Sequence, residues 1–561
     1  MGVPTDFPTG SSRRRTLQAC KRWKVAPCPL DSEYWRETLR QEGFPFEFQT
    51  WLYRSITEGV NLGFREQPSN HQPPYRSSTA EERTLLAEQY RQECALGRTV
   101  RVGEAQPSGP LFSCFYVSPM YTIPKKQLVG QPQKWRLIHN LSFNRAGKDR
   151  SVNGGIPLAH FPVDYPTVTT AAHLLFCEAP AGSIIWGRDM KAYYRHLMVN
   201  PGCWWMMGSA FGDSYYFDCY CPFGARSMPA VFQRLTDAIR VIALRRANCD
   251  GLVALLDDFL GVTHRRPLES DISIMQRATA QARAFNDELL RLGITRNQDK
   301  DLAPCSAGVW LGIYFDMDTY HLTIPLSKIR ETRAFFMVVI TDNTGRPPTT
   351  VKAGDLQVLV GKLSHMSSTW VLGKILLWPL YQSMLAAITI KDGNRVVRKC
   401  ATIPLTEVGR EALLEWDAKL KTENLTKRFF TCTETNRRVT TIAIWRKSHK
   451  GTTNLELNSP WGSVNKEFAR STAMAKVKRA NRCLFAAVVL LHRWMLLWLN
   501  DCEQVIHLRS NVGRLVEYVT KDFYPKGLGM EGYRVSLKIG RLLEGHSSEE
   551  RTRQMYAFFI N

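Results

Sequence analysis

The chain has 561 residues, enough for two to four domains that each bury a hydrophobic core. Its 74 lysines and arginines exceed its 51 aspartates and glutamates, and the net charge of +23 favours a polyanionic partner because neutralised phosphates release counterions. Nucleic acid is the first expectation and a membrane surface the second. The cysteines show no zinc-finger spacing and the N-terminus lacks the apolar core of a signal peptide, so we expect reduced thiols and an intracellular protein.

Residues 1–105 combine a basic arm with Pro- and Ser-rich patches such as QPSNHQPPYRSS. This composition resists compact packing, so we expect a partly extended region. The run of three arginines at 13–15 either contacts phosphates or belongs to a solvated tail.

Residues 106–325 alternate short apolar runs with helical repeats. The runs 184–186 and 252–256 suit the central strands of a sheet, and each leads toward an acidic residue. Apolar residues recur at helical spacing over 231–242 and again over 275–292. The pattern therefore predicts a sheet backed by two helices.

Residues 326–427 are predicted to be largely helical, whereas 428–561 returns to a mixed pattern with strands expected at 439–445 and 505–508. The most apolar run, 484–499, contains a histidine and an arginine and is too short to cross a bilayer comfortably. We expect a buried helix there and no membrane span. The order of these elements suggests a second α/β domain.

Two adjacent acids, Asp257 and Asp258, stand between two apolar runs. Neighbouring side chains of a regular strand point to opposite faces, so a sheet presents both acids together only at a hairpin turn, and Gly261 suits such a hairpin. Acids that end a buried strand need cations, which makes a divalent metal the natural partner. Asp189 ends another apolar run and would complete a clamp for two Mg²⁺ ions. The alternative is an ordinary solvated turn.

Together with PFGARSMPAVFQ at 222–233, these acids resemble the motifs of retroelement reverse transcriptases, nearest to those of gypsy-like and DIRS-type retrotransposons. Further matches follow in the order of the family between about residues 112 and 325: the basic segment 125–136, VNGGIP at 152–157, LGI at 292–294 and WLGI at 310–313. The resemblance implies an α/β right-hand polymerase. Its fingers and α+β palm would occupy 106–325, its thumb and connection 326–427, and a ribonuclease-H-like α/β domain 428–561.

The same resemblance assigns roles to residues. Asp189 and Asp257 would bind metal directly, with Asp258 beside them and the backbone carbonyl of Met190 completing one coordination sphere. Tyr194 stands where the family keeps an aromatic beneath the sugar, which implies a preference for deoxynucleotides; a core tyrosine is the alternative. The nucleotide would be bound by Lys125, Lys126, Lys134, Arg136, Tyr194, Phe223, Gly224 and Lys300. The primer and template would contact Trp310, Leu311, Gly312, Lys362 and His365.

For the cations the alternative is a solvated surface charge, and for Lys362 and His365 it is ordinary packing of a helix. The chain also departs from the family at Leu255, where a tyrosine is usual two residues before the first acid of the pair. That change removes no metal ligand.

The expected ribonuclease H acids are missing. The strand 440–445 and the helix 481–499 contain no acid, and Ser510-Asn511 stands where the family has Asp-Asn. The remaining acids do not align with the family: Glu456, Glu467, Asp501, Glu517 and Asp522. We therefore predict an inactive ribonuclease-H-like domain that retains a basic surface for hybrids, formed by Lys476, Lys478, Arg479 and Arg482.

The expected reaction is template-directed addition of deoxynucleoside triphosphates to a primer 3′-end on RNA or DNA, with two Mg²⁺ ions or Mn²⁺ as a substitute. Two alternatives stay open. One is a retired reverse transcriptase that serves as a scaffold for nucleic acid or a protein complex, and the other is template-independent terminal transfer. Three intact acids argue against the scaffold, because an acid cluster without cations is costly.

Overall fold

The computed structural model describes residues 12–65, 79–104, 115–124, 133, 135–143, 151–341, 345–370, 372–391, 394–428, 442–447, 453–459 and 462–468. The chain divides into two compact units, each described by itself below. The first unit comprises Met1–Pro166, Trp186–Gly261 and Gln276–Pro304; the second comprises Thr167–Ile185, Val262–Met275 and Cys305–Asn561. The four segments expected from the sequence do not coincide with these two units and stay a prediction.

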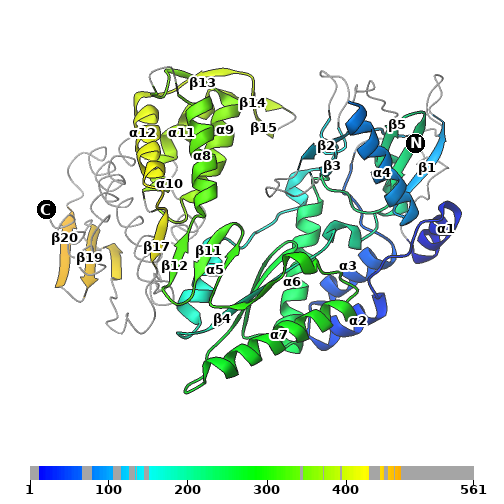
Figure 1. Ribbon diagram of the computed structural model, residues 1–561, viewed down its shortest axis with the longest axis horizontal. Helices are drawn as coiled ribbons and strands as arrows, with labels where there is room; N and C mark the ends of the chain where they lie inside the picture. Colours follow the sequence, from blue (N-terminus) through cyan, green and yellow to red (C-terminus); the bar gives the residue numbers. More distant parts are fainter. Residues whose placement is uncertain are drawn as a thin grey trace. The chain divides into compact units, whose positions relative to one another are not determined.

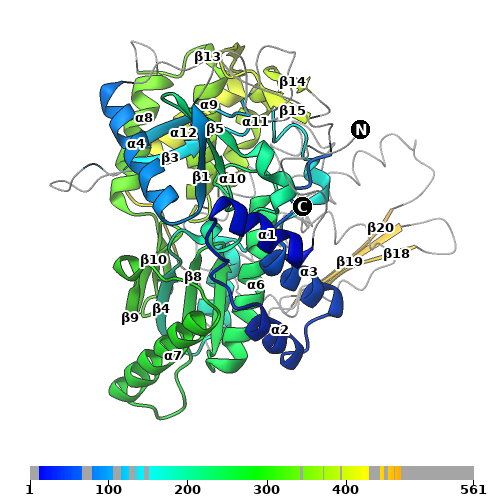
Figure 2. The same ribbon diagram turned by 90° about the vertical axis from the view of Figure 1, so that its right-hand side faces the viewer.

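The described residues of the N-terminal region, 12–65 and 79–104, are folded, which corrects the expectation of a partly extended region there. They form the helices α1 (Arg13–Trp23), α2 (Ser32–Gln41), α3 (Phe46–Thr57) and α4 (Ala80–Ala95), of which α1, α2 and α3 lie together (Figure 2). The side chains of Ser12, Asp31 and Thr79 cap the first turns of α1, α2 and α4.

Burial explains why this region packs. Trp35, Leu39 and Leu52 are fully buried, and the Trp35 indole donates to the Leu292 carbonyl at 2.9 Å. The Pro- and Ser-rich patch that suggested an extended region, QPSNHQPPYRSS, lies outside the described residues, and the composition of the whole region conceals the helical spacing of the apolar side chains.

The first unit also contains a three-stranded antiparallel sheet in the order β1-β6-β5, from β1 (Thr99–Glu104), β5 (Gly208–Phe211) and β6 (Ser214–Asp218). A separate antiparallel pair joins β2 (Met120–Pro124) to β3 (Trp135–His139). Helix α4 contacts β1, β2 and β3, so the N-terminal segment is an integral part of this fold.

The acids come from a four-stranded sheet in the order β7-β8-β4-β9. Its strands are β4 (Ile184–Asp189), β7 (Gly251–Leu255), β8 (Asp258–Thr263) and β9 (Leu302–Cys305). Helix α6 (Met228–Arg246) contacts β7, and Phe285 of α7 (Asp271–Arg291) lies 5.6 Å from Trp186 and 5.4 Å from Phe259 between ring centroids. The predicted strands and the two predicted helices are confirmed.

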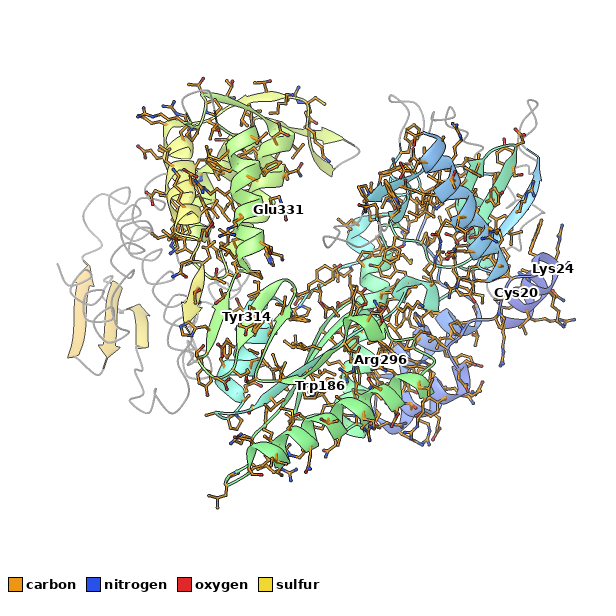
Figure 3. The ribbon with its side chains drawn as sticks, viewed as in Figure 1. Cys20, Lys24, Trp186, Arg296, Tyr314 and Glu331 are labelled. Atoms are coloured by element: carbon orange, nitrogen blue, oxygen red, sulfur yellow. The ribbon has the colours of Figure 1, made fainter. Side chains whose placement is uncertain are left out.

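Gly261 belongs to the predicted hairpin, in its second strand. It lies within β8, outside the turn, and a β-carbon there would collide with the indole of Trp186, which is labelled in Figure 3. Trp186 is fully buried, so the glycine allows a large ring to pack directly on the strand.

The second unit is largely helical over 326–427, as predicted. Its helices α8 (Leu326–Val339), α9 (Ala353–Met366), α10 (Gly373–Leu376), α11 (Trp378–Leu385) and α12 (Glu407–Lys421) pack as a group (Figure 1). Two antiparallel pairs accompany them: β13 (Thr350–Lys352) with β16 (Thr402–Pro404), and β14 (Ile388–Lys391) with β15 (Asn394–Val397).

A four-stranded sheet in this unit has the order β10-β11-β12-β17. It consists of β10 (Ala307–Trp310), β11 (Ile313–Asp316), β12 (His321–Thr323) and β17 (Thr426–Arg428). The short helix α5 (Val168–His173) and a π-helical turn (Leu174–Glu178) precede the unit's main part in sequence, and Phe176 lies 6.1 Å from Phe315 of β11 between ring centroids.

The C-terminal segment contributes one antiparallel sheet, from β18 (Ile442–Lys447), β19 (Thr453–Ser459) and β20 (Gly462–Phe468). The strand expected at 439–445 overlaps β18, and Glu456 and Glu467 stand on β19 and β20. Outside the described residues lie the expected helix 481–499, the strand 505–508, Ser510-Asn511, Asp501, Glu517, Asp522, Lys476, Lys478, Arg479 and Arg482. In the part of the chain that is described, no helix combines the length and apolarity needed to cross a membrane.

Candidate active site

A two-residue turn of Leu256 and Asp257 connects β7 to β8, so the predicted hairpin is confirmed. Leu256 has a φ of 52°, in the left-handed region that a leucine rarely adopts. Such a conformation costs on the order of 1 kcal/mol and persists only where surrounding contacts impose it. The acidic turn therefore needs support from neighbouring elements.

Helix α6 supplies that support through Gln233 and Thr236, which are 2% and 0% exposed. The Gln233 Oε1 accepts from the Leu256 amide at 3.0 Å, and its Nε2 donates to the Ala254 carbonyl at 3.3 Å. The Thr236 hydroxyl donates to the Leu256 carbonyl at 2.7 Å. Because the two side chains are three residues apart on one helix, they share a face and bind the amide and the carbonyl of the same residue, Leu256.

Asp189 ends β4 beside this turn. The amide of the next residue, Met190, donates to the backbone carbonyl of Asp257 at 2.8 Å, which joins the strand end to the acidic turn. Met190 is 1% exposed, and its carbonyl as a metal ligand stays a prediction.

The Asp189 carboxylate has two side-chain partners. Its Oδ1 accepts from Asn297 Nδ2 at 3.0 Å, and its Oδ2 pairs with Lys300 Nζ at 2.9 Å. The Asn297 amide also donates to the Asp189 carbonyl at 2.8 Å. Lys300 was expected to bind a nucleotide, whereas Asn297 was not among the expected site residues, although it stands only three residues before Lys300 in the sequence.

That Asp189, Asp257 and Asp258 bind metal together stays a prediction. Among the described residues, no group of three or more histidines, cysteines, aspartates or glutamates stands close enough together to hold a metal ion. In this structure the Asp189 carboxylate is directed to Lys300 and Asn297.

The donors nonetheless suit Mg²⁺ chemically, because carboxylate oxygens are the ligands it prefers and a backbone hydrogen bond already joins the two strand ends. The Lys300 side chain is 62% exposed, so its ammonium can leave Asp189 for solvent when a cation replaces it.

Tyr194 follows in a 3₁₀ turn (Tyr193–His196) and is 8% exposed. Its ring lies 4.7 Å from that of Phe223 and 4.6 Å from that of Phe232, between centroids. Burial, followed by the charges of Tyr165 and Asp257, raises the pKa of Tyr194, so its hydroxyl is neutral. The Tyr194 side chain is thus largely buried and held by its neighbours, while Phe223 is 49% exposed and offers an accessible aromatic face.

Gly224 has a φ of 111°, and a β-carbon there would lie 2.8 Å from the His139 carbonyl oxygen. Asn153 fixes this turn: its Nδ2 donates to the Gly224 carbonyl at 2.7 Å and its Oδ1 accepts from the Arg226 amide at 2.8 Å. The two segments VNGGIP and PFGAR are therefore in contact, and Asn153 is a positioning residue that the sequence motif contained without an assigned role.

Of the expected phosphate-binding cations, Lys125, Lys126 and Lys134 lie outside the described residues. Arg136 belongs to β3, where its backbone pairs with Ile123 of β2.

The expected primer and template residues lie in the second unit. Leu311 and Gly312 form the turn between β10 and β11, with φ values of 49° and 72°, as a type I′ hairpin requires at both positions. His365 of α9 makes a hydrogen bond with the Gly312 backbone, and burial, with Lys328 nearby, lowers the pKa of His365. The structure thus brings Gly312 and His365 together.

The other two residues of that group are engaged elsewhere. Trp310 is 3% exposed, so its side chain belongs to the core beneath the turn. Lys362 pairs with Glu331 at 2.7 Å and its Nζ lies 5.9 Å from the Phe335 ring centroid. Ordinary packing accounts for these contacts, and a nucleic-acid role for both stays a prediction.

No protein-family model and no curated protein matches this chain. Among solved structures it is similar to a foamy viral protease-reverse transcriptase, in a form designated dRH, in complex with double-stranded DNA: TM-score 0.45, 13% identity, 80% of this chain and 71% of that one. It is also similar to the foamy viral protease-reverse transcriptase in complex with an RNA/DNA hybrid, with a TM-score of 0.42 and 13% identity over 78% of this chain and 52% of that one. The same protein in complex with double-stranded DNA gives a TM-score of 0.44 and 14% identity over 82% of this chain and 86% of that one. At these scores the likeness is coarse, and the proposals below rest on this chain's own residues.

Proposed function

We propose that this chain is a reverse transcriptase of the gypsy-like or DIRS type, which extends a DNA primer on an RNA or DNA template. The observation that carries the proposal is the acidic turn. Helix α6 holds Leu256–Asp257 in a strained conformation, and the Met190–Asp257 hydrogen bond sets Asp189 beside it. Left-handed residues are ordinary in a two-residue hairpin, but two adjacent acids at the end of buried strands are costly without cations, so a turn with only a structural role would gain nothing from them.

Asp189, Asp257 and Asp258 would hold the Mg²⁺ ions, for which Mn²⁺ can substitute. Bound metal would stabilise the negative charge that develops on the transferred phosphoryl group. In this scheme the Lys300 ammonium leaves Asp189 and turns to the phosphates of the incoming nucleotide. The net charge of +23 supports a polyanionic substrate as well.

Tyr194 and Phe223 would form the aromatic surface beneath the sugar. The buried Tyr194 ring cannot retreat, because it packs against Phe232 at 4.6 Å, so a ribose 2′-hydroxyl placed over it would meet a fixed wall. The proposed substrates are accordingly deoxynucleoside triphosphates.

Primer extension by the full chain tests the proposal. The assay compares the wild type with Asp257→Asn and Asp258→Asn on RNA and DNA templates, with Asp213→Asn as the matched control, since Asp213 is an exposed acid in the β5–β6 turn. Wild type and control should extend the primer, and Asp257→Asn should lose activity by at least on the order of 100-fold. A wild type that makes no product, or an Asp257→Asn enzyme as active as the control, would contradict it.

Two further arms separate the alternatives. Product without any template would indicate terminal transfer, and tight binding of primer–template without extension would indicate a scaffold. For the sugar, Tyr194→Ala should admit ribonucleotides, whereas Tyr194→Phe, which keeps the ring, should not.

The ribonuclease H activity is proposed to be lost. Incubating the pure protein with a labelled RNA/DNA hybrid should leave the RNA intact, and cleavage that requires Mg²⁺ would contradict this part of the proposal.

A further inference from the structure

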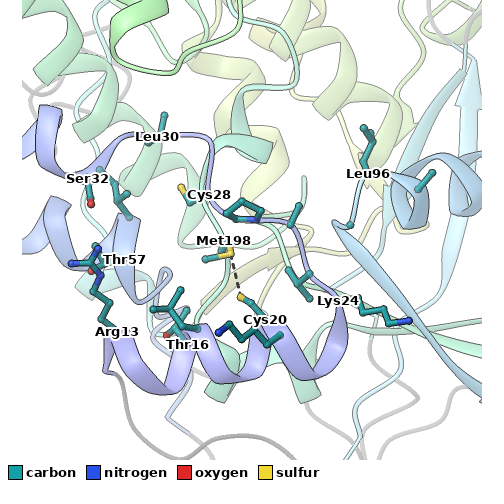
Figure 4. Close-up of a pocket in the computed structure, with 18 residues that line it drawn as sticks. Arg13, Thr16, Cys20, Lys24, Cys28, Leu30, Ser32, Thr57, Leu96 and Met198 are labelled. Carbon is teal, nitrogen blue, oxygen red and sulfur yellow. Dashed lines mark hydrogen bonds between the residues drawn. The ribbon is translucent and has the colours of Figure 1, made fainter.

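A cavity of about 640 Å³ lies in the first unit, away from the acidic turn in sequence. Its walls come from α1, the segment that joins α1 to α2, the last turn of α3 and the end of α4, with Met198 at the centre of the view (Figure 4). Pockets of roughly 300–1,000 Å³ are the size that holds small organic ligands. The lining residues are Arg13, Thr16, Leu17, Cys20, Lys21, Lys24, Val25, Ala26, Pro27, Cys28, Leu30, Ser32, Ile56, Thr57, Ala95, Leu96, Gly97 and Met198.

The cavity is lined mainly by aliphatic and sulfur-containing side chains. The Cys20 Sγ lies 3.9 Å from the Met198 Sδ, and the Cys28 thiol donates to the His196 carbonyl at 3.2 Å. Burial raises the pKa of Cys20 to about 11 and that of Cys28 to about 12, so both thiols are neutral and act as apolar surface.

Two large apolar side chains on the lining are open to solvent. Leu17 of α1 is 53% exposed and Leu96, which follows α4, is 52% exposed. Among the described residues that line the cavity, none has an aromatic ring. A nucleobase would therefore find no stacking partner, and the walls fit an aliphatic chain better.

The charged side chains that line the cavity are all basic. Arg13, Lys21 and Lys24 line it, and none of the described lining residues is acidic. Arg13 is partly neutralised by Glu33, at 3.8 Å, whereas Lys21 and Lys24 stand exposed at the end of α1. Two ammonium groups beside an apolar cavity are complementary to a ligand with one acidic head and an apolar body.

We propose that this cavity binds a small amphipathic anion, an unbranched aliphatic carboxylic acid, with its chain against Met198 and its carboxylate between Lys21 and Lys24. The inference does not depend on the polymerase proposal, since none of these residues belongs to the acidic turn.

Calorimetric titration of the full chain with octanoate, decanoate and dodecanoate tests the proposal. Each added methylene should tighten binding about four-fold, until the chain fills the cavity. Decanol, which has the apolar body without the charge, should bind several-fold more weakly than decanoate. No binding of any acid, equal affinity across the series, or equal affinity for decanol would overturn the proposal.

Variants locate the site. Lys21→Glu/Lys24→Glu should weaken decanoate binding at least ten-fold, whereas the matched pair Arg14→Glu/Arg22→Glu, on the same helix but not lining the cavity, should leave it within two-fold. Leu96→Ser removes an exposed apolar contact without opening the core and should weaken binding as well. Equal losses in the two charge-reversal pairs would refute the assignment, with circular dichroism melts confirming that each variant is folded.

The same acid could reach the site from solution or as part of a lipid surface. Co-sedimentation with phosphatidylglycerol vesicles separates the two sources. Binding to vesicles by a protein that does not bind free decanoate would overturn the proposal in favour of a membrane surface.

Discussion

Gln233→Ala tests the support of the acidic turn. The side chain makes three hydrogen bonds, with the Leu256 amide at 3.0 Å, the Ala254 carbonyl at 3.3 Å and Asp237 Oδ1 at 3.1 Å. Its loss leaves two backbone groups of the hairpin without their side-chain partner. At about 1 kcal/mol for each net hydrogen bond, the free energy of unfolding should fall by roughly 3 kcal/mol.

Gln233→Ala should also lower the rate of primer extension by folded protein, an effect that the loss of stability does not explain. Without Gln233, the left-handed conformation of Leu256 is favoured by fewer contacts, so the turn can relax and move Asp257. We expect the single-turnover rate of primer extension to fall about ten-fold at a temperature where the variant is fully folded, since small displacements of reacting groups have effects of this size or larger. Urea unfolding and rapid-quench extension measure the two quantities.

Gln281→Ala provides the control. Gln281 is also buried, at 6% exposed, and its Nε2 donates to the Asn248 carbonyl at 2.7 Å, away from the acidic turn in sequence. Gln281→Ala should lower the free energy of unfolding while leaving the rate of primer extension unchanged. If Gln233→Ala likewise lost stability but extended primers at the wild-type rate, the turn would not depend on Gln233 and the reasoning would fail.

Three other changes have defined outcomes. Gly261→Ala forces a methyl group into the Trp186 indole and should reduce the free energy of unfolding by about 1–3 kcal/mol in urea titrations. Lys300→Met removes the ammonium that is paired with Asp189, so Mn²⁺ no longer has to displace it. Titration calorimetry should show that the free protein is half-saturated at a several-fold lower Mn²⁺ concentration. Burial lowers the pKa of His196, so as the pH falls the unfolded chain binds a proton at this residue before the folded chain does. The free energy of unfolding should therefore be at its full value above about pH 6.5 and decline below it. His196→Gln should make the free energy of unfolding depend less steeply on pH in this range.

The sequence was sufficient to predict the hairpin and its surroundings. Two apolar runs that flank adjacent acids leave few alternatives to a turn, because a regular strand would bury one acid. The long apolar repeats that became α6 and α7 were equally clear, since many residues share one helical period.

The contacts that decide the chemistry were beyond sequence patterns. Lys300 was expected to bind a nucleotide, and only the folded chain shows that it lies 2.9 Å from Asp189 across a separation of more than a hundred residues. Gly261 was expected to suit the hairpin, but only the folded chain shows that the Trp186 ring lies where a β-carbon of residue 261 would be. Neither contact leaves a local signal in the chain.

The N-terminal helices were missed for a different reason. The extended region was predicted from the average composition of residues 1–105, in which proline and serine are prominent. The helices are instead indicated by single apolar residues at helical spacing, such as Trp35 and Leu39, which are buried in the structure. A period of 3.6 residues is visible only within each short helix, and three of the four helices have 12 residues or fewer.

The strand order β7-β8-β4-β9 also has a consequence for how the chain folds. The β7–β8 hairpin closes locally, but its neighbour β4 ends at Asp189 and β9 begins at Leu302, so both must return from distant parts of the chain. Closing long loops is slow because chain entropy is lost before non-local contacts form. The acids of the hairpin should therefore be in place early during refolding, while Asp189 joins them in a later and slower step that sets the pace at which a competent site appears.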